Sequence, residues 1–553
     1  MQTIAELVRA RAGDTNVGLR FEDSSWTWAD VVENAAPRAA LYRALAPADA
    51  PFHVGVLLDN IPEFWFTLCG AALAGATVVG INPTRRGAEL ARDIAHTDCA
   101  FVLTESAHLH LFEAAGDAVG SGRLHVVDDP TWSDALAPFA GAPLPEPERG
   151  PSPADTFMLI FTSGTTGAPK AVRMGHARLA AYGEKLAEMF GLTPGHDVCY
   201  SVMPLFHSNA VVSGFANVLA AGATGVLRRR FSATSFLPDL RRYDVTFFNY
   251  VGKPLSYILA TPERADDADN PLRIAFGNEA APLDIDRFAR RFDCIVADGY
   301  GSTEGGLNMS RTPETPKGSL GLPVAPIRAV ILDPDTGEEC PRAAFDEHGR
   351  LLNAETAIGE IVNPDGGGGF EGYYNNPEAD AERMRDGVYW TGDLGYRDEH
   401  GFFYFAGRSG DWLRVDGENF AATPVELVLA RHPDVIVAAV YAVPAVDVGD
   451  EVMAALHVRD DADFDSLRLP SFLAGQSDLS PKWVPRFVRV THELPSTATQ
   501  KVLKRVLRHQ RWECDDPVWW RPDRGPDYRR LTPEDVATLR ARFVERDREH
   551  LIG

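Results

Sequence analysis

The chain has 553 residues, of which 45% are hydrophobic and 24% are charged, the balance of a large globular protein with several domains. Its formal net charge is −24, from 54 basic and 78 acidic residues. This balance excludes a general nucleic-acid binder, because binding to phosphates needs a basic face. The six cysteines form no Cys-x-x-Cys pair, so the sequence predicts neither a zinc site nor a redox dithiol and fits a reducing cytoplasm.

The first predicted elements are a short amphipathic helix over residues 1–14 and an uncharged stretch over residues 64–81. The uncharged stretch runs for 18 residues, which is the lower limit for a membrane span. It changes, however, from small, helix-favouring residues to the β-branched run "TVVGI". We therefore predict a buried helix that leads into a buried strand, not a membrane span.

Apolar, strand-like runs then alternate with helical segments along the first part of the chain. We predict strands at 53–58, 77–82, 100–104 and 156–161, with helix-like segments among them. This alternation predicts an α/β fold in which helices cover mainly parallel sheets.

The composition changes near residue 365. The passage 365–380, "DGGGGFEGYYNNPEAD", is rich in turn-forming residues, and 389–420 alternates strands with tight turns, which predicts antiparallel hairpins in a small barrel-like part. Strands at 435–443 and 451–458 predict a smaller, mobile α+β domain. We place the boundary at Gly410, so that the two predicted domains are 1–409 and 410–553.

One loop after a predicted strand looks suited to an anion. The stretch 160–172, "IFTSGTTGAPKAV", fits neither the Walker A pattern nor the dinucleotide fingerprint. Its hydroxyls and glycine amides can donate to phosphate oxygens and its lysine adds a positive charge, although an ordinary Ser/Thr/Gly turn is the alternative. The candidate phosphate ligands are Thr162, Ser163, Gly164, Thr165, Thr166, Gly167 and Lys170.

Three later segments carry further polar candidates. In "ADGYGSTEGG" at 297–306, Glu304 stands beside hydroxyls, as a Mg²⁺-bound nucleotide requires, although a solvated glutamate in a polar loop is the alternative. Asp393, in "WTGDLG", can accept both ribose hydroxyls, and Arg408 follows in "AGRSGD". Lys501 lies in 494–512, where five basic residues and no acidic residue occur.

These pieces, in this order, resemble the adenylate-forming superfamily of acyl-CoA synthetases, adenylation domains and luciferases. The segments "YVGKPLSYIL", "LRIAFGNEAAP" and "DWLRVDGENFAATPVE" are similar to its fatty-acid-transport-protein branch, and most of all to actinobacterial fatty-acid–CoA ligases, some of which act in sterol side-chain breakdown. The resemblance runs from about residue 55 to 510. It implies that a fatty or sterol-derived carboxylic acid reacts with MgATP to give acyl-AMP and pyrophosphate, after which coenzyme A displaces AMP.

The resemblance also implies a role for each candidate residue. The 162–170 loop would hold the β- and γ-phosphates of ATP, Thr303 would donate to the α-phosphate, and Glu304 would bind Mg²⁺. Asp393 and Arg408 would take the ribose, and Lys501 would bridge the attacking carboxylate and the α-phosphate. The residues implied around the adenine are Gly277, Asn278, Glu279, Ala280, Asp298, Gly299 and Tyr300.

For the second half-reaction the resemblance implies that the small domain swings about a hinge at Gly410. A loop that includes Gly417 and Glu418 would then line the tunnel for the pantetheine of coenzyme A. The chain departs from the family pattern at Gln500, where a glycine usually precedes the lysine. It departs again at Gly410, where many relatives have a charged residue.

His207 and the arginine runs have two interpretations each. A lone histidine after an apolar run is typical of a satisfied buried residue, whereas the family match places His207 in the active site as a gate or positioning residue at the mouth of the acyl pocket. The runs 228–230 and 241–242 are typical of a solvated surface, but could also meet the nucleotide end of coenzyme A or an anionic membrane.

Two other functions stay open at this point. The protein could be a fatty acyl-AMP ligase that loads a carrier protein. It could also be a non-catalytic homologue that binds lipid or acts as a scaffold, but that would require lost site residues, and Thr166, Lys170, Glu304, Asp393, Arg408 and Lys501 are all present. We expect a cytoplasmic enzyme, and leave open both a peripheral contact with the inner membrane face and the formation of a homodimer.

Overall fold

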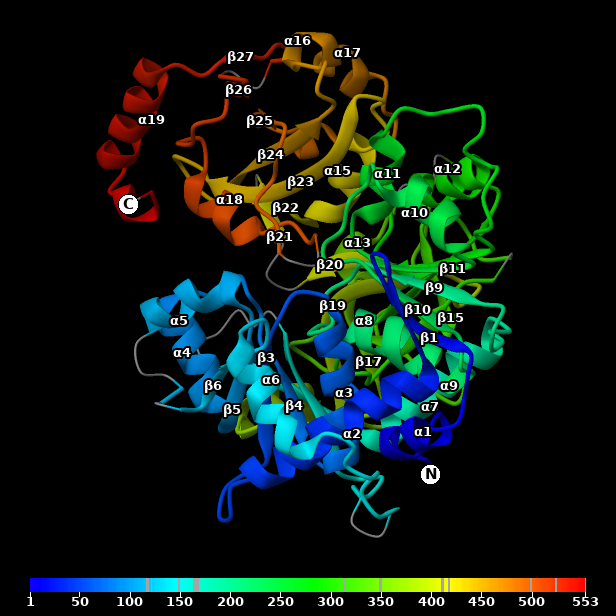
Figure 1. Ribbon diagram of the computed structural model, residues 1–553. Coiled ribbons are helices and arrows are strands. Elements are labelled where there is room, and N and C mark those ends of the chain that lie inside the picture. The colour runs from blue at the N-terminus through cyan, green and yellow to red at the C-terminus, as the bar shows by residue number, and fades with distance from the viewer. Residues whose placement is uncertain are drawn as a thin grey trace. The chain divides into compact units, whose positions relative to one another are not determined.

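The computed structural model divides into two units. Figure 1 draws the whole chain, coloured from blue at the N-terminus to red at the C-terminus. Unit 1 comprises Met1–Glu279, Ile285–Gly306 and Gly367–Asp386, and unit 2 comprises Ala280–Asp284, Leu307–Gly366 and Gly387–Gly553. The structure describes residues 1–115, 119–120, 122–147, 150–162, 169–312, 314–347, 351–408, 412–415, 418–497, 500–522 and 525–552. Gly410 lies outside these ranges, so the predicted domain boundary stays a prediction.

The first sheet of unit 1 has the strand order β6-β5-β3-β4-β7-β8, parallel except for the last pair. Its strands are β3 (His53–Leu57), β4 (Thr77–Gly80), β5 (Cys99–Thr104), β6 (Leu124–Val126), β7 (Thr156–Thr162) and β8 (Lys170–Gly175). Four of them confirm the strands expected from the sequence. The helices of this region are α3 (Pro62–Ala74), α4 (Gly87–His96), α5 (Leu109–Ala115) and α6 (Pro130–Leu136).

The uncharged stretch forms a buried helix and a buried strand, as predicted. Helix α3 is buried from Phe64 to Ala74, ends at Gly75 in a left-handed conformation, and leads into the fully buried β4. Glycine is favoured there because it has no Cβ to clash at a positive φ. None of the helices in the described ranges has the length and apolar character needed to cross a membrane.

The second sheet of unit 1 has the order β13-β12-β11-β9-β10-β1-β2, parallel except for β1 and β2. Its strands are β1 (Val17–Phe21), β2 (Ser24–Thr27), β9 (Val198–Ser201), β10 (Thr224–Leu227), β11 (Phe247–Val251), β12 (Ile274–Asn278) and β13 (Ile295–Gly301). The associated helices include α1 (Ile4–Ala10), α2 (Trp28–Leu45), α7 (His176–Met189), α9 (Asn217–Ala221), α10 (Phe236–Tyr243), α11 (Pro254–Ala260) and α12 (Pro282–Phe292).

An aromatic cluster packs this sheet against its helices. Phe236 of α10 lies with its ring centroid 4.9 Å from that of Phe248 on β11 and 5.7 Å from that of Phe288 on α12. Such contacts bury large apolar surfaces and fix the direction of the strands. The carboxyl ends of parallel strands meet at one edge of a sheet, which is where ligands bind in open α/β folds.

Unit 2 contains an antiparallel group of strands, of which β19 and β20 lie in the segment 389–420, where the sequence predicts hairpins. Their order is β16-β17-β19-β20-β15-β14, and β21 and β22 form a separate hairpin. The bounds are β14 (Asn308–Ser310), β15 (Ser319–Pro323), β16 (Val330–Leu332), β17 (Gly359–Asn363), β19 (Val388–Arg397), β20 (Phe403–Arg408), β21 (Trp412–Val415) and β22 (Glu418–Ala421). The hairpins predicted for 389–420 are therefore confirmed.

The C-terminal part of unit 2 is a mixed five-stranded sheet with helices, as expected for an α+β domain. It consists of β23 (Val435–Pro444), β24 (Asp450–Val458), β25 (Phe487–Thr491), β26 (Val518–Trp520) and β27 (Arg529–Arg530), with α15 (Ala422–Leu429), α18 (Lys504–Gln510) and α19 (Pro533–Glu545). Trp519 stacks on Phe464 at 4.4 Å, and Trp512 stacks on Phe543 of α19 at 6.2 Å. These stacking contacts pack β26 and α19 against neighbouring parts of the domain.

Candidate active site

The residues expected around an adenine lie at the carboxyl ends of β12 and β13. Gly277 is in register with Asp298, and Asn278 with Gly299, whose carbonyl accepts a hydrogen bond from Asn278 Nδ2 at 2.9 Å. Tyr300 follows on β13. The structure therefore brings together polar residues from two separate sequence motifs.

The backbone at this edge has little freedom. A Cβ on Gly277 would lie 2.2 Å from the carbonyl oxygen of Tyr250 and 2.7 Å from its ring, so only glycine fits. Glu279 adopts φ +67°, which is uncommon for a residue with a side chain and often marks a functional turn. Ala280 belongs to unit 2.

Asp298 is held by a buried tyrosine. The hydroxyl of Tyr250 on β11 donates to Asp298 Oδ2 at 2.9 Å, and the side chain of Tyr250 is fully buried. Burial leaves the carboxylate of Asp298 dependent on such donors, since a buried polar group without a partner is costly.

Thr303 and Glu304 lie on the turn that follows β13. The Thr303 and Ser208 hydroxyl oxygens are 2.8 Å apart, and the Thr303 carbonyl accepts a hydrogen bond from Arg178 Nη2 at 2.7 Å. Gly305 has φ +71°, and a Cβ there would lie 2.2 Å from the same Nη2. The turn is therefore fixed by side chains that come from far away in the sequence.

Glu304 is buried, with 6% of its surface exposed, and its Oε1 accepts a hydrogen bond of 2.8 Å from the hydroxyl of Tyr373. The alternative of a solvated glutamate is therefore wrong. A carboxylate and a neighbouring hydroxyl are hard oxygen donors, which is the ligand chemistry that Mg²⁺ prefers. Glu304 and Thr303 thus fit the role of holding a Mg²⁺–nucleotide.

The two ends of the predicted phosphate loop lie on neighbouring, paired strands. Thr162 at the end of β7 is in register with Lys170 at the start of β8. The ammonium of Lys170 pairs with Glu382 at 2.8 Å and lies 5.9 Å from the centre of the Tyr373 ring. The other candidates, Ser163, Gly164, Thr165, Thr166 and Gly167, lie outside the described residues.

Sequence reasoning missed the segment that supplies Tyr373. The passage 365–380 reads as a turn-rich connector, but its backbone pairs with β8: Arg173 N donates to Gly372 O at 3.0 Å and Tyr374 N to Ala171 O at 2.8 Å. Tyr373 itself forms a β-bridge with Val172 and is buried. The only sequence signal for it is an aromatic pair in a glycine-rich passage.

His207 caps the short helix α8 (Ser208–Ala210), where its Nδ1 accepts a hydrogen bond from Asn209 N at 3.3 Å. A π-helix, η4 (Val211–Ala216), follows directly. π-Helical turns are rare and are frequent at functional sites. The cap gives His207 a structural role, and the gating role stays a prediction.

In unit 2, Asp393 and Arg408 face each other on neighbouring strands. They are register partners on β19 and β20, and Arg408 Nε donates to Asp393 Oδ1 at 3.2 Å. Asp393 is 8% exposed. Gly417 and the side chain of Glu418 lie outside the described residues.

Lys501 stands at the end of a tight turn. Thr497 N donates to Lys501 O at 2.8 Å, Lys501 N donates to Thr497 Oγ1 at 3.0 Å, and Gln500 N donates to Thr497 O at 2.9 Å. Gln500 has φ +62°. The position where relatives usually have glycine thus keeps a glycine-like conformation while carrying a glutamine.

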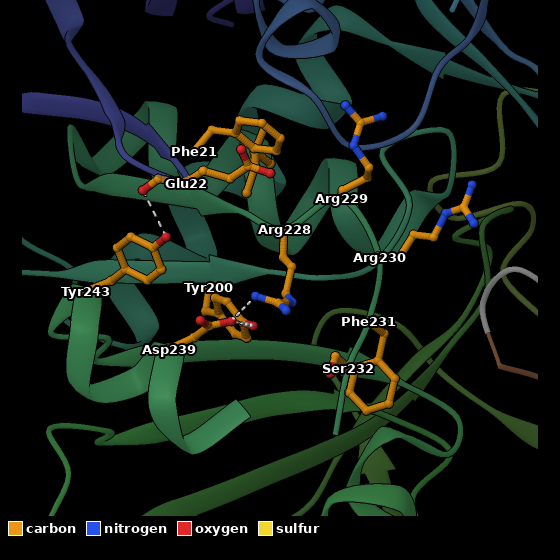
Figure 2. A pocket seen from close by; sticks show the side chains of 11 residues that line it. Phe21, Glu22, Tyr200, Arg228, Arg229, Arg230, Phe231, Ser232, Asp239 and Tyr243 are labelled. Atoms are coloured by element: carbon orange, nitrogen blue, oxygen red, sulfur yellow. Dashed lines mark hydrogen bonds and ion pairs between the residues drawn. The ribbon is translucent and has the colours of Figure 1, made fainter. Parts of the chain in front are cut away.

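Both arginine runs are matched by carboxylates in unit 1. A pocket of about 340 Å³ lies at the first run, and Arg228 Nη1 is 2.6 Å from Asp239 Oδ2. Figure 2 shows Arg228 pointing toward Tyr200 and Asp239, while Arg229 and Arg230 point away from them. The other ion pairs are Arg229–Glu105, Arg230–Asp59, Arg241–Asp266 and Arg242–Asp23. These runs are therefore not an unopposed basic patch, which favours the surface interpretation over an anion site.

Comparison with known families agrees with this geometry. Residues 7–374 match the model of the AMP-binding enzyme family, and residues 424–501 match the model of the AMP-binding enzyme C-terminal domain. The chain belongs to the AMP-binding enzyme family, which confirms the resemblance drawn from its motifs.

Characterised relatives resemble the chain over almost its full length. It is 49% identical to the steroid-22-oyl-CoA synthetase of Rhodococcus jostii (strain RHA1), covering 100% of this chain and 99% of that protein. It is 50% identical to the medium/long-chain-fatty-acid–CoA ligase FadD17 of Mycobacterium marinum, covering 94% of this chain and 98% of that one. Long-chain fatty acid transport protein 1 of Bos taurus is more distant, at 31% identity over 88% of this chain and 78% of that protein.

Solved structures confirm the fold class. The anthranilate CoA ligase AuaEII, in complex with anthranoyl-AMP, has a TM-score of 0.77 at 21% identity, covering 92% of this chain and 96% of that chain. ATP-bound MatB from Rhodopseudomonas palustris has a TM-score of 0.77 at 23% identity, covering 92% of this chain and 99% of that chain. At these identities the likeness concerns the fold alone.

Proposed function

We propose that this protein is an AMP-forming acid–CoA ligase for a fatty acid or a steroid side-chain acid. The observation that carries the proposal is the identity of about half the residues, over nearly the full length, to two acid–CoA ligases. The retained polar residues support it, since Lys170, Glu304, Asp393, Arg408 and Lys501 are all present.

In the first half-reaction a carboxylate oxygen attacks the α-phosphorus of ATP, and the bond to the pyrophosphate oxygen breaks. The difficulty is that an anion approaches a polyanion, so the site must neutralise charge before it can position the reactants. We assign this task to Lys170, to Lys501 and to the hydroxyl of Thr303. Mg²⁺, which Glu304 would hold, neutralises phosphate charge when bound.

In the second half-reaction the thiol of coenzyme A attacks the acyl carbonyl and AMP leaves. We propose that the domain that carries Lys501 for the first reaction presents a different surface for the second one. We propose that residues 410–553 turn about Gly410 between the two reactions. The region around Gly417 and Glu418 would then face the pantetheine.

We assign the base of the nucleotide to the polar residues at the carboxyl ends of β12 and β13. Support comes from the register of Gly277 with Asp298 and of Asn278 with Gly299, and from the neighbouring turn at Glu279, whose φ is +67°. Asp393 is a buried acceptor that suits the two ribose hydroxyls, with Arg408 holding its orientation. We further propose a cytoplasmic location; the six cysteines, none of which is in a disulfide, are in keeping with it.

A substrate panel tests the proposal. Straight-chain acids from C8 to C24 and steroid side-chain carboxylates are incubated with ATP, Mg²⁺ and coenzyme A, and acyl-CoA and AMP are quantified. We expect acyl-CoA from at least one member of the panel. Pyrophosphate exchange without acyl-CoA would instead indicate an acyl-AMP ligase that loads a carrier protein, and the absence of both would indicate a homologue without catalysis.

A further inference from the structure

Tyr373 stands between two charged side chains of unit 1. Its hydroxyl donates to Glu304 Oε1 at 2.8 Å and accepts a hydrogen bond from Arg383 Nε at 3.2 Å. A guanidinium can only donate, so the single phenolic proton must point to Glu304. The two bonds therefore fix both the phenol and the carboxylate that it contacts.

The geometry makes this phenol the donor to Glu304. The hydroxyl has one proton, and the bond from Arg383 Nε already uses its oxygen as an acceptor. Because the bond engages Oε1 of Glu304, the second carboxylate oxygen can serve a cation.

The ring of Tyr373 meets the end of the phosphate loop. The ammonium of Lys170 lies 5.9 Å from the ring centre, within the range of a cation–π contact, and pairs with Glu382 at 2.8 Å. Glu382 and Arg383 are adjacent on α14 (Pro377–Arg383), so one short helix supplies a partner to the lysine and a partner to the phenol.

The backbone holds this arrangement in place. Residues 372–374 pair with β8, and Tyr373 packs in a small cluster with Val172, Ala379 and Phe370. The strand that starts at Lys170 and the segment that carries Tyr373 therefore move together. The ring of Tyr373 contacts the lysine and its hydroxyl contacts Glu304.

We propose that Tyr373 is a positioning residue that couples Glu304 to Lys170 and thereby sets the affinity for a complex of a divalent cation with a nucleoside triphosphate. The inference rests on the proposed function, because that function assigns the cation to Glu304 and the phosphates to the loop of Lys170. Groups that hold a metal ligand through a hydrogen bond commonly change metal affinity by about 10- to 100-fold when removed.

The test is the variant Tyr373→Phe, which keeps the ring and removes only the hydroxyl. Binding of Mn²⁺ in the presence of ATP is measured by electron paramagnetic resonance of the free ion, and the Mg²⁺ dependence of pyrophosphate exchange is measured in parallel. We expect the dissociation constant for Mn²⁺ to rise about 10-fold or more, and the Mg²⁺ concentration for half-maximal exchange to rise with it.

Tyr374→Phe is the matched control, because the Tyr374 hydroxyl donates to Asp98 at 2.8 Å, away from Glu304. We expect it to change neither quantity more than about twofold, which is within the range of a surface substitution. Arg383→Met is a second variant: it removes the donor that orients the phenol, and we expect a smaller loss of Mn²⁺ affinity in the same direction. Thermal unfolding of all three variants separates a loss of affinity from a loss of folding.

Unchanged Mn²⁺ binding in a folded Tyr373→Phe protein would overturn the inference, as would equal losses in Tyr373→Phe and Tyr374→Phe. A wild-type protein that forms no acyl-CoA, but whose Mn²⁺·ATP affinity still depends on Tyr373, would overturn the proposed function and keep the inference. A wild-type protein that binds no Mn²⁺·ATP would overturn both.

Discussion

The turn of Glu304 and the turn of Lys501 are organised in opposite ways. Around Glu304 the hydrogen bonds come from residues 69 positions away at Tyr373, 95 at Ser208 and 125 at Arg178, the last two through Thr303. At Lys501, by contrast, the backbone N and O bond to Thr497, four positions away, and Gln500 N also bonds to Thr497. Tertiary contacts therefore hold the first turn, whereas local hydrogen bonds shape the backbone of the second.

This difference suits the two roles that we propose, the binding of a metal–nucleotide by Glu304 and the entry of Lys501 into the site for the first half-reaction. A group that binds a metal–nucleotide gains from partners that fix it before the substrate arrives, because no reorganisation is then needed during the reaction. A lysine that must enter and leave a site gains from a turn that keeps its shape wherever its domain stands. The comparison predicts that distant substitutions perturb Glu304 and that local ones perturb the backbone at Lys501.

The largest expected effect is that of Lys501→Ala. Loss of the cation that bridges two anions should lower pyrophosphate exchange by about 10²- to 10³-fold. Formation of acyl-CoA from supplied acyl-AMP should fall less than about 10-fold, since the lysine serves only the first half-reaction. The first reaction is followed by incorporation of labelled pyrophosphate into ATP, and the second by release of AMP and acyl-CoA. Equal losses in the two assays would contradict the proposal that Lys501 acts in the first half-reaction alone.

The second largest effect is expected for Glu304→Gln. The substitution keeps an oxygen that can accept the Tyr373 hydrogen bond but removes the negative charge. We expect exchange to fall by about 10²-fold and its Mg²⁺ requirement to rise, as measured by titrating Mg²⁺ at fixed ATP. Glu89→Gln, on the exposed face of α4, is the control and should match the wild type. An unchanged Mg²⁺ requirement would remove the metal role of Glu304.

The third prediction concerns the pH dependence of the free energy of unfolding, to which the buried His176 contributes. His176 begins α7, the helix that carries Arg178, and burial lowers the pKa of its imidazole to about 4. The unfolded state therefore binds more protons between pH 6.5 and 4, so unfolding becomes easier as the pH falls through that window and changes no further below it. The shift corresponds to about 3 kcal/mol.

Denaturant unfolding at pH 7 and pH 5 checks this expectation. His176→Leu should lose part of the acid sensitivity, whereas His196→Gln should keep it, because the side chain of His196 is 70% exposed. Equal acid sensitivity in the wild type and His176→Leu would exclude this histidine as its source.

The smallest expected effect is at Gln500. A left-handed residue with a side chain costs about 1–2 kcal/mol, and glycine relieves that cost while adding about 0.5–1 kcal/mol of unfolded-state entropy. We expect Gln500→Gly to raise the free energy of unfolding by up to about 1 kcal/mol and to change exchange less than about threefold. Gln500→Ala keeps a Cβ and should gain nothing. A glycine variant less stable than the alanine variant would show that the turn is not strained.

Much of the fold was predictable because its causes are local. The alternation of apolar strands with helices around 53–104 requires parallel sheets, and the change from small to β-branched residues in 64–81 separates a buried helix from a strand. The motifs of the proposed nucleotide site could be identified for a related reason. Chemistry demands certain residue types at short spacings, as in the hydroxyls and carboxylate of 302–304.

Other features could not be read from spacing. The passage 365–380 has the composition of a connector, yet it pairs with β8 and brings Tyr373 to Glu304. The arginines of 228–230 look like a basic patch, yet Arg228 pairs with nearby Asp239, and Arg229 and Arg230 pair with the distant carboxylates of Glu105 and Asp59. Both outcomes depend on which distant segments the topology places side by side.

The amino-acid sequence by itself determined the family, the order of the strands and helices, and the identity of the polar groups that would meet the nucleotide. Tertiary structure alone decided that Glu304 is buried, that a phenol orients it, and that the arginine runs are neutralised. The reason is physical: patterns and motifs act over a few residues, whereas burial and ion pairing are set by neighbours that only the folded chain brings together.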